Sequence, residues 1–428
     1  MKKNIFALFA GAACLISLQA HAIDYGPFSL TGFAKAEGAW VTNVCQGCQL
    51  FPDENKQRLW ADILIPGKEY KTRWTHVTLF QPYLGARFDL DGGFKVNALV
   101  SQRWRDGLID IPGFMYEKNI SLSHEYYGSI HYGAMTTRGW SLADFPYGTN
   151  LNVADAWGAS GAGYGILENA IRYISPRMDV LEGDLVLEAS YDKGDTRFRI
   201  HKSRFVELYA QYAKDDLVLD LISQDTKNGQ PQSWGHGPFI GLTPNAADDP
   251  LLSSASQGIL MLMGRYQYNN QLEFSGGVRS NRWSGASAVI TGTENGNALW
   301  NSMFNVDWGG TLNGVSNPGY SARSTDYLLG LRYRISKWTS SLGVVYLGTA
   351  TTSNPQERGQ SNAALIANAG LNYNLGGGLE AYGSVGMVQY KQLGLSPMSM
   401  PSNSAFTQVD SRVTRTGQWI GAGVVYTY

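Results

Sequence analysis

Apolar and polar residues alternate with a period of two through most of this chain, in segments of roughly ten residues separated by turns. Segment 76–90 places apolar side chains on one face of a strand and polar side chains on the other. Asp91–Gly93 forms a turn, in which glycine permits positive φ, and segment 94–105 then alternates in the same way. The cations on the polar faces of these two strands are Arg87, Lys95, Arg103 and Arg105. The pattern predicts a β-hairpin.

The same reading along the whole chain predicts sixteen strands, joined by seven short turns and eight longer connections. Their centres are Phe33, Leu84, Ala98, Ile120, Tyr132, Ile171, Leu187, Leu208, Leu219, Leu262, Phe274, Leu331, Val344, Ala369, Val385 and Val424. The segments around Ile120 and Leu219 alternate least clearly, which leaves the count open by about two strands. An even number of antiparallel strands with both termini on one side fits a closed transmembrane β-barrel. Sixteen strands would leave an aqueous channel, whereas eight would be filled by side chains.

Composition agrees with an all-β membrane protein. Charged residues make up 16% of the chain and aromatic residues 12%, with 50 glycines, whereas soluble domains are roughly a quarter charged. Outside the N-terminal segment, no stretch is apolar for the length that a transmembrane helix requires. These values fit strands with one face in lipid and the other in water. The tryptophans at strand ends, which would form interfacial girdles, are Trp40, Trp104, Trp283 and Trp338.

The N-terminal segment has the features of a secretory signal peptide. Lys2 and Lys3 precede an apolar run over 5–18, and Ala20–Ala22 has the A-x-A form of a cleavage site. We expect residues 1–22 to be removed, which leaves a single barrel domain over 23–428. The net charge of that domain is −1 − 2 = −3. It lacks the basic excess of a nucleic-acid-binding protein.

The cysteines carry little information about function. Cys45 and Cys48 form one C-x-x-C pair, with no second pair or nearby histidine to complete a zinc site. In an oxidising compartment they can close a small disulfide within a loop, and a functional thiol site is the alternative. No cofactor or metal is predicted. A lipoprotein signal around Cys14 lacks the aliphatic residue expected three positions upstream.

The last strand alternates from Ile420 to the terminal Tyr428. A terminal aromatic residue on an apolar stripe, here Tyr426 and Tyr428, resembles the C-terminal signature by which barrel proteins reach the outer-membrane assembly machinery. Most such proteins end in Phe, so Tyr428 departs slightly from that signature. An edge strand of an ordinary β-sandwich is the alternative interpretation.

The whole mature chain resembles, mostly as a pattern of strands and turns, the sixteen-stranded general porins of Gram-negative bacteria, in particular the trimeric porins of β-proteobacteria. Segment Phe28–Trp40 is similar to their first strand, and Leu84–Phe94 is similar to their second strand and first turn. The resemblance implies an outer-membrane homotrimer, in contact with lipid and lipopolysaccharide, that lets small hydrophilic solutes and ions diffuse through a water-filled pore. It also implies that the third external loop folds into the barrel and narrows the pore.

The corresponding loop runs from Arg138 to Leu167. It is rich in small residues, and its acids are Asp144 and Asp155, with Glu168 just beyond it. On the resemblance, these acids would face the basic wall formed by Arg87, Lys95, Arg103 and Arg105. Because the cations outnumber the loop acids, we expect a weak preference for anions. A surface loop outside the pore is the alternative.

Three other functions stay open. An outer-membrane hydrolase needs a catalytic histidine, and none lies in a recognisable motif, although His236 shares a long loop with Asp248 and Asp249. A substrate-selective channel for a nutrient, such as a sugar or an organic acid, would use the aromatic residues of segments 225–257 and 284–324. An adhesin or purely structural barrel would conduct no ions.

Overall fold

The computed structural model describes residues 23–45, 70–109, 115–142, 165–194, 199–200, 202–228, 256–284, 311–312, 315–316, 321–353, 359–392 and 415–428. The predicted signal peptide, residues 1–22, lies outside them. In this part of the chain, no helix is long and apolar enough to cross a membrane.

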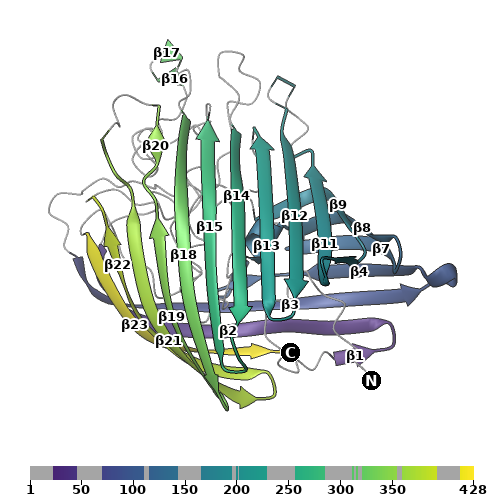
Figure 1. The fold of residues 1–428 in the computed structure, drawn as a ribbon, viewed down its shortest axis with the longest axis horizontal. Helices are drawn as coiled ribbons and strands as arrows, with labels where there is room; N and C mark the ends of the chain where they lie inside the picture. Colours follow the sequence, from purple (N-terminus) through teal and green to yellow (C-terminus); the bar gives the residue numbers. More distant parts are fainter. Residues whose placement is uncertain are drawn as a thin grey trace.

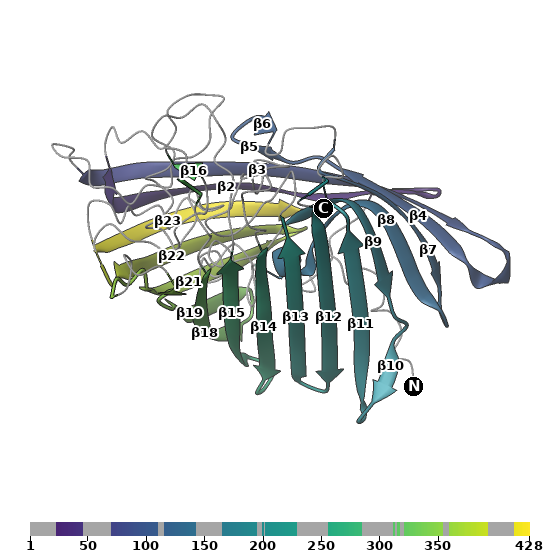
Figure 2. The ribbon, with the colours of Figure 1, turned by 90° about the horizontal axis from the view of Figure 1, so that it is seen from above.

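Within the described ranges, sixteen antiparallel strands form a closed barrel (Figures 1 and 2). They are β2 (Phe28–Cys45), β3 (Tyr70–Asp89), β4 (Lys95–Ser101), β7 (Glu117–His124), β8 (Gly128–Thr136), β9 (Ile166–Ile174), β11 (Gly183–Asp192), β12 (Arg204–Lys214), β13 (Leu217–Lys227), β14 (Ser256–Gln267), β15 (Leu272–Ser284), β18 (Ser321–Ile335), β19 (Trp338–Leu347), β21 (Ala364–Gly376), β22 (Leu379–Tyr390) and β23 (Thr416–Thr427). Closure occurs where β23 pairs with β2, from Phe33 opposite Thr427 to Val41 opposite Trp419. Each predicted strand centre lies in one of these strands, so the predicted barrel is confirmed.

Short elements accompany the sixteen barrel strands, and two of the short strands pair only with each other in a separate sheet. The strands among them are β1 (Ile23–Tyr25), β5 (Trp104–Arg105), β6 (Leu108–Ile109), β10 (Met178–Val180), β16 (Thr311–Leu312), β17 (Val315–Ser316) and β20 (Thr351–Thr352). The helical turns are η1 (Asp91–Gly93) and α1 (Arg138–Ser141). One predicted strand is shorter than expected, because β4 ends at Ser101 and only β5 resumes pairing with β3.

The two ends of the barrel differ in their connections. Short turns join strand pairs at one end, for example η1 between β3 and β4, where Gly92 and Gly93 adopt φ values of 73° and 82°. Long connections leave the other end, at the top of Figure 1. In outer-membrane barrels the short turns are periplasmic and the long loops are external. The start of β2 and the C-terminal Tyr428 lie at the short-turn end, where the backbones of Gly32 and Tyr428 exchange two hydrogen bonds.

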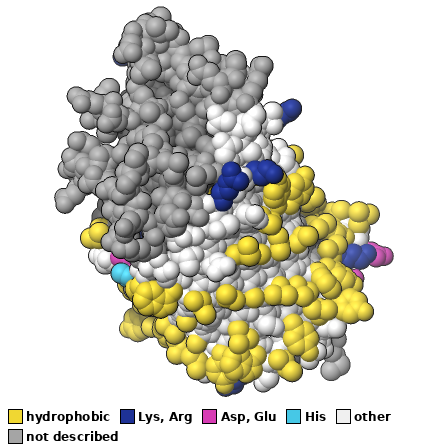
Figure 3. Space-filling model, turned by 90° about the vertical axis from the view of Figure 1, so that its left-hand side faces the viewer, with side chains coloured by type: hydrophobic (Ala, Val, Ile, Leu, Met, Phe, Trp, Pro, Cys, Tyr) yellow, Lys and Arg dark blue, Asp and Glu magenta, His cyan; other side chains and the backbone are white. Residues whose placement is uncertain are grey.

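The wall is inverted relative to a soluble protein, with apolar side chains outside and polar side chains inside. In β18, Tyr327 and Leu329 are 51% and 69% exposed, whereas Asp326 and Arg332 are 2% and 4% exposed. Hydrophobic side chains cover the lower wall in Figure 3, with Lys and Arg side chains at the upper edge of that band. A soluble protein buries its apolar residues and exposes its charges. The outer face is therefore a lipid-facing surface.

Aromatic residues stand at both edges of this apolar surface. Trp40 and Trp74 lie near the external end, with ring centroids 5.3 Å apart. Trp338 and Tyr373 lie at the short-turn end, with centroids 4.5 Å apart. The predicted girdle residue Trp104 stacks on Phe80. The side chain of Trp283 lies outside the described part of the chain.

Candidate functional site

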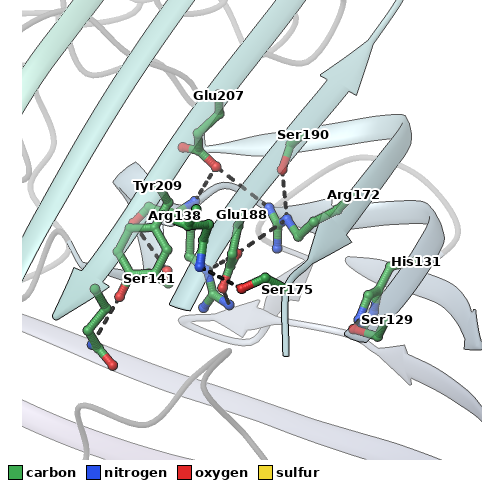
Figure 4. Close-up of polar contacts among 12 residues, drawn as sticks. Ser129, His131, Arg138, Ser141, Arg172, Ser175, Glu188, Ser190, Glu207 and Tyr209 are labelled. Carbon is green, nitrogen blue, oxygen red and sulfur yellow. Dashed lines mark hydrogen bonds and ion pairs between the residues drawn. The ribbon is translucent and has the colours of Figure 1, made fainter. Parts of the chain in front are cut away.

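The inner face carries a cluster of charged residues where the third external connection begins (Figure 4). Alternation directs Arg172 of β9, Glu188 of β11 and Glu207 of β12 inward, and all three are buried. Cross-strand register places Ser190 opposite both Arg172 and Glu207, which brings the three strands' polar side chains to one level of the lumen.

Arg138, the first residue of α1, is held against this wall. Its Nε donates a hydrogen bond to Oε2 of Glu188 at 2.6 Å, and its Nη2 also donates to the Glu188 carboxylate. The backbone N–H groups of Arg138 and Gly139 donate to Glu207 at 2.8 and 3.0 Å. The guanidinium lies 5.3 Å from the ring centroid of Tyr209. The chain therefore turns into the barrel as it leaves β8.

Arg172 completes the cluster. Its Nε donates to Oγ of Ser190 at 2.7 Å, and its Nη2 donates to the carbonyl of Thr136 at 2.7 Å. The same guanidinium lies 4.0 Å from Glu188 and 3.7 Å from Glu207. Two arginines thus balance two glutamates, which is necessary because an unpaired buried charge is costly.

Further ion pairs occur on the inner face elsewhere around the barrel. Arg332 donates to both carboxylate oxygens of Glu273, at 2.7 and 2.8 Å. Arg279 donates to Oδ2 of Asp326 at 2.8 Å, and Lys35 lies 3.3 Å from Glu37. The described inner wall is therefore highly polar, as expected for an aqueous lumen.

Two of the four predicted basic-wall residues lie near the short-turn end. Arg87 is opposite Asn97 and Lys95 is opposite Asp89, all on the inner face. Arg87 is exposed, and its Nη2 lies 3.4 Å from Oδ1 of Asp89. These cations thus line the periplasmic half of the wall, beside one acid.

The other two basic-wall residues lie closer to the external end. Arg105 of β5 pairs with Leu79 on the inner face, eight residues along β3 from Arg87. Arg103 is buried, and its Nη1 donates to the hydroxyl of Tyr116 at 3.4 Å. Eight strand residues span about 26 Å. The structure therefore divides the four cations into two pairs at different depths and does not gather them into one ring.

The predicted constriction loop is described only at its ends. Asp144 and Asp155 lie outside the described residues. Glu168 is half-buried in β9, beside the register shift in the pairing of β8 with β9. The predicted loop boundary at Leu167 is wrong, because pairing of Thr136 with Ile166 and of Met135 with Leu167 starts β9 at Ile166. That these acids constrict the pore stays a prediction.

The cysteines and the C-terminal tyrosines are placed as follows. Cys45 is the last residue of β2, but its side chain and the whole of Cys48 lie outside the described part. Tyr426 faces outward and its ring stacks on that of Tyr428, with centroids 5.6 Å apart. The disulfide and the assembly signal stay predictions.

Sequence reasoning did not select Arg138, Arg172, Glu188 and Glu207 as site residues. Alternation alone assigns Glu188 and Glu207 to the polar faces of their strands. Their contact with Arg138 depends on the path of the chain after β8, for which the period-two pattern holds no information. Within the described residues, no group of three or more His, Cys, Asp or Glu side chains could hold a metal ion.

Comparison with known proteins gives one family and several structures with the same fold. No curated protein matches the sequence. The anion-selective porin from Comamonas acidovorans is 14% identical, with a TM-score of 0.58, and the match covers 94% of this chain and 99% of that one. A loop L8 deletion mutant of OmpT, an outer membrane protein of Vibrio cholerae, is 12% identical with a TM-score of 0.56. The match covers 95% of this chain and 100% of that one. The outer membrane channel DcaP of Acinetobacter baumannii is 10% identical with a TM-score of 0.54. The match covers 94% of this chain and 97% of that one.

These identities are low enough that the structural likeness shows the fold alone. The family model carries the assignment, because the model of the Gram-negative porins matches residues 7–393, which is most of the chain. The closed barrel with its lipid-facing outer surface agrees with that match. The chain belongs to the Gram-negative porin family.

Proposed function

We propose that this protein is an outer-membrane porin that lets small hydrophilic solutes and ions diffuse passively through a water-filled channel. The observation that carries this proposal is the inverted wall: a closed barrel of sixteen described strands, apolar outside and charged inside. A barrel of this size is too wide for its own wall side chains to fill. An aqueous lumen with charged walls conducts ions without any chemical step.

The charges of the wall favour a weak preference for anions. On β3, β4 and the adjoining segment to β5, four cations (Arg87, Lys95, Arg103 and Arg105) accompany Asp89. Further around the barrel, where α1 meets β9, β11 and β12, Arg138 and Arg172 balance Glu188 and Glu207. The excess of positive charge therefore lies on the β3 side. An excess of cations on the wall of an aqueous pore favours anions over cations.

Ion selectivity in a planar bilayer tests this proposal. Under a KCl gradient, the wild-type reversal potential is expected to have the sign of an anion-preferring pore, and Arg103→Glu is expected to shift it toward cations. Lys118→Glu is the matched control, because Lys118 is an exposed cation on the outer face of β7. A reversal potential unchanged by Arg103→Glu in a heat-modifiable, folded protein would refute the basic wall. Saturable block by one sugar or organic acid would instead favour the substrate-selective channel.

We also propose that the protein assembles as a homotrimer and catalyses no reaction. The trimer rests on the family resemblance, and cross-linking in native outer membranes tests it. On the catalytic side, Oγ of Ser129 lies 3.0 Å from Nε2 of His131. Among the described residues, no carboxylate is hydrogen-bonded to that ring to complete a triad. His131→Ala is therefore expected to leave conductance unchanged. No hydrolytic activity is expected in the wild-type protein, so none is expected to be lost in the variant.

A further inference from the structure

The outer face carries a fixed pair of guanidinium groups at the external ends of β12, β13 and β15. Nη2 of Arg204 lies 3.2 Å from Oδ2 of Asp225, and Nη2 of Arg282 lies 2.6 Å from Oδ1. The side chains of Arg204 and Arg282 are 55% and 61% exposed. A guanidinium has five N–H donors, so one bond to the carboxylate leaves others for a further anion.

A glycine on the intervening strand permits this arrangement. Gly258 of β14 lies between Asp225 and Arg282 in the cross-strand register. A Cβ at this position would meet the Nε and Nη2 atoms of Arg282 at 2.8 and 2.9 Å. The Arg282 side chain therefore lies flat across β14 to reach Asp225, two strands away, instead of extending into solution.

Two more cations extend the cluster. Arg323 of β18 is directly opposite Arg282, and Lys227 of β13 is directly opposite Arg204. Both side chains are exposed, and among the described residues neither has a carboxylate partner. Like charges directly opposite each other on a sheet are destabilising. The pair Arg282 and Arg323 is therefore expected to have a compensating anion. We call the set Arg204, Lys227, Arg282 and Arg323 the outer-rim cluster.

The cluster lies directly above the lipid-facing surface. Four residues nearer the short turns than Arg204, Asp225 and Arg323, each strand presents an apolar side chain to the outside. These are Leu208 of β12, Leu221 of β13 and Tyr327 of β18, which are 54%, 44% and 51% exposed. Four strand residues correspond to about 13 Å, which places the cations at the level of the headgroups of the outer leaflet. These strands stand side by side in Figure 1, with their external ends at the top.

We propose that the outer-rim cluster binds the phosphate groups of a phosphorylated glycolipid of the outer leaflet, such as the lipid A part of lipopolysaccharide. Four cations accompany one carboxylate, so the site matches a ligand with more than one negative charge. The continuity of the cluster with the apolar wall favours a phosphate that carries acyl chains over a soluble one. The proposal rests on the outer-membrane location of the proposed porin but not on its conductance.

Lipid binding by the full-length protein in detergent tests the proposal, with native mass spectrometry as the readout. The probe is bisphosphorylated lipid A, and phosphate-free lipid A and inorganic pyrophosphate are the comparison ligands. The variant is Arg282→Gln with Arg323→Gln. Lys118→Gln is the control, because it removes one exposed outward cation at the external end of a distant strand, β7.

The double variant is expected to bind bisphosphorylated lipid A about tenfold more weakly or worse, since charged hydrogen bonds are lost. Lys118→Gln is expected to bind bisphosphorylated lipid A as tightly as wild type does. Wild type is expected to bind phosphate-free lipid A as weakly as the double variant binds bisphosphorylated lipid A. Equal binding by the double variant would overturn the proposal. So would displacement of lipid A by an equal concentration of pyrophosphate, because the site would then recognise phosphate alone.

Two further measurements separate this proposal from the porin function. If the double variant does not fold, Arg323→Gln alone is used, and its affinity for bisphosphorylated lipid A is expected to fall about threefold. An unchanged affinity of this single variant would overturn the proposal. The conductance of either variant is expected to equal that of wild type, because the outer-rim cluster faces away from the lumen. A wild-type protein that binds lipid A but conducts no ions would overturn the porin function and leave the lipid site intact.

Discussion

At the scale of single residues, the inner wall is built from charges that satisfy one another. Glu188 lies between Arg138 and Arg172, and Glu207 accepts bonds from the backbone of α1 and from Gln224 at 2.6 Å. The contacts of Arg138 with Glu188 and Glu207 join residues 50 and 69 positions apart, whereas the others cross between neighbouring strands. The cluster thus attaches the start of the third external connection to the barrel wall.

Arg138→Gln tests the strength of that attachment. The substitution leaves Glu188 buried without its bidentate partner, and breaking a buried pair costs about 3 to 5 kcal/mol. The free energy of unfolding in urea, measured in lipid vesicles, is expected to fall by that order. Arg177→Gln is the control, because Arg177 pairs with Asp184 at the exposed periplasmic rim, where an ion pair contributes about 1 kcal/mol at most. Equal losses for the two variants would contradict the role of the cluster.

At the scale of the strand, exposure has opposite meanings on the wall and in the turns. Leu329 is 69% exposed in the middle of β18, and Leu181 is 81% exposed in the periplasmic turn before β11. The first faces lipid and the second faces water. Leu329→Arg is therefore expected to lower the free energy of unfolding by about 2 to 4 kcal/mol. Leu181→Arg is expected to change it little, and similar values for both would argue that β18 does not face lipid.

The terminal strand makes the closure of the barrel testable. β23 pairs with β2, and the backbones of Tyr428 and Gly32 exchange two hydrogen bonds, 2.9 and 3.0 Å long. Deletion of Tyr428 removes both backbone hydrogen bonds and the terminal aromatic residue. Tyr428→Phe keeps the two hydrogen bonds and a terminal aromatic ring. The deletion is expected to reduce the heat-modifiable fraction in the outer membrane severalfold, and Tyr428→Phe to leave it unchanged. Equal assembly of both variants would exclude Tyr428 as part of the assembly signal.

At the scale of the whole molecule, the strand plan could be predicted from the sequence because two solvents impose it. Lipid outside and water inside force a period of two on every strand, so even the weak segments around Ile120 and Leu219 are strands β7 and β13. The site could be predicted only in part. Alternation placed Arg87, Lys95 and Arg105 on the inner face, but the depth of each cation depends on cross-strand register and on the break after Ser101. The contact of Arg138 with Glu188 depends on a loop that has no periodicity.

The central claim, that this barrel is a water-filled diffusion pore, is tested most directly by single-channel conductance of the purified protein in a planar bilayer. Because ions cross such a pore nearly as they do in bulk solution, stepwise openings are expected whose conductance rises in proportion to KCl concentration. A conductance that saturates at low salt would indicate a binding site in place of an open pore. A folded, heat-modifiable protein that inserts and gives no conductance steps would contradict the account.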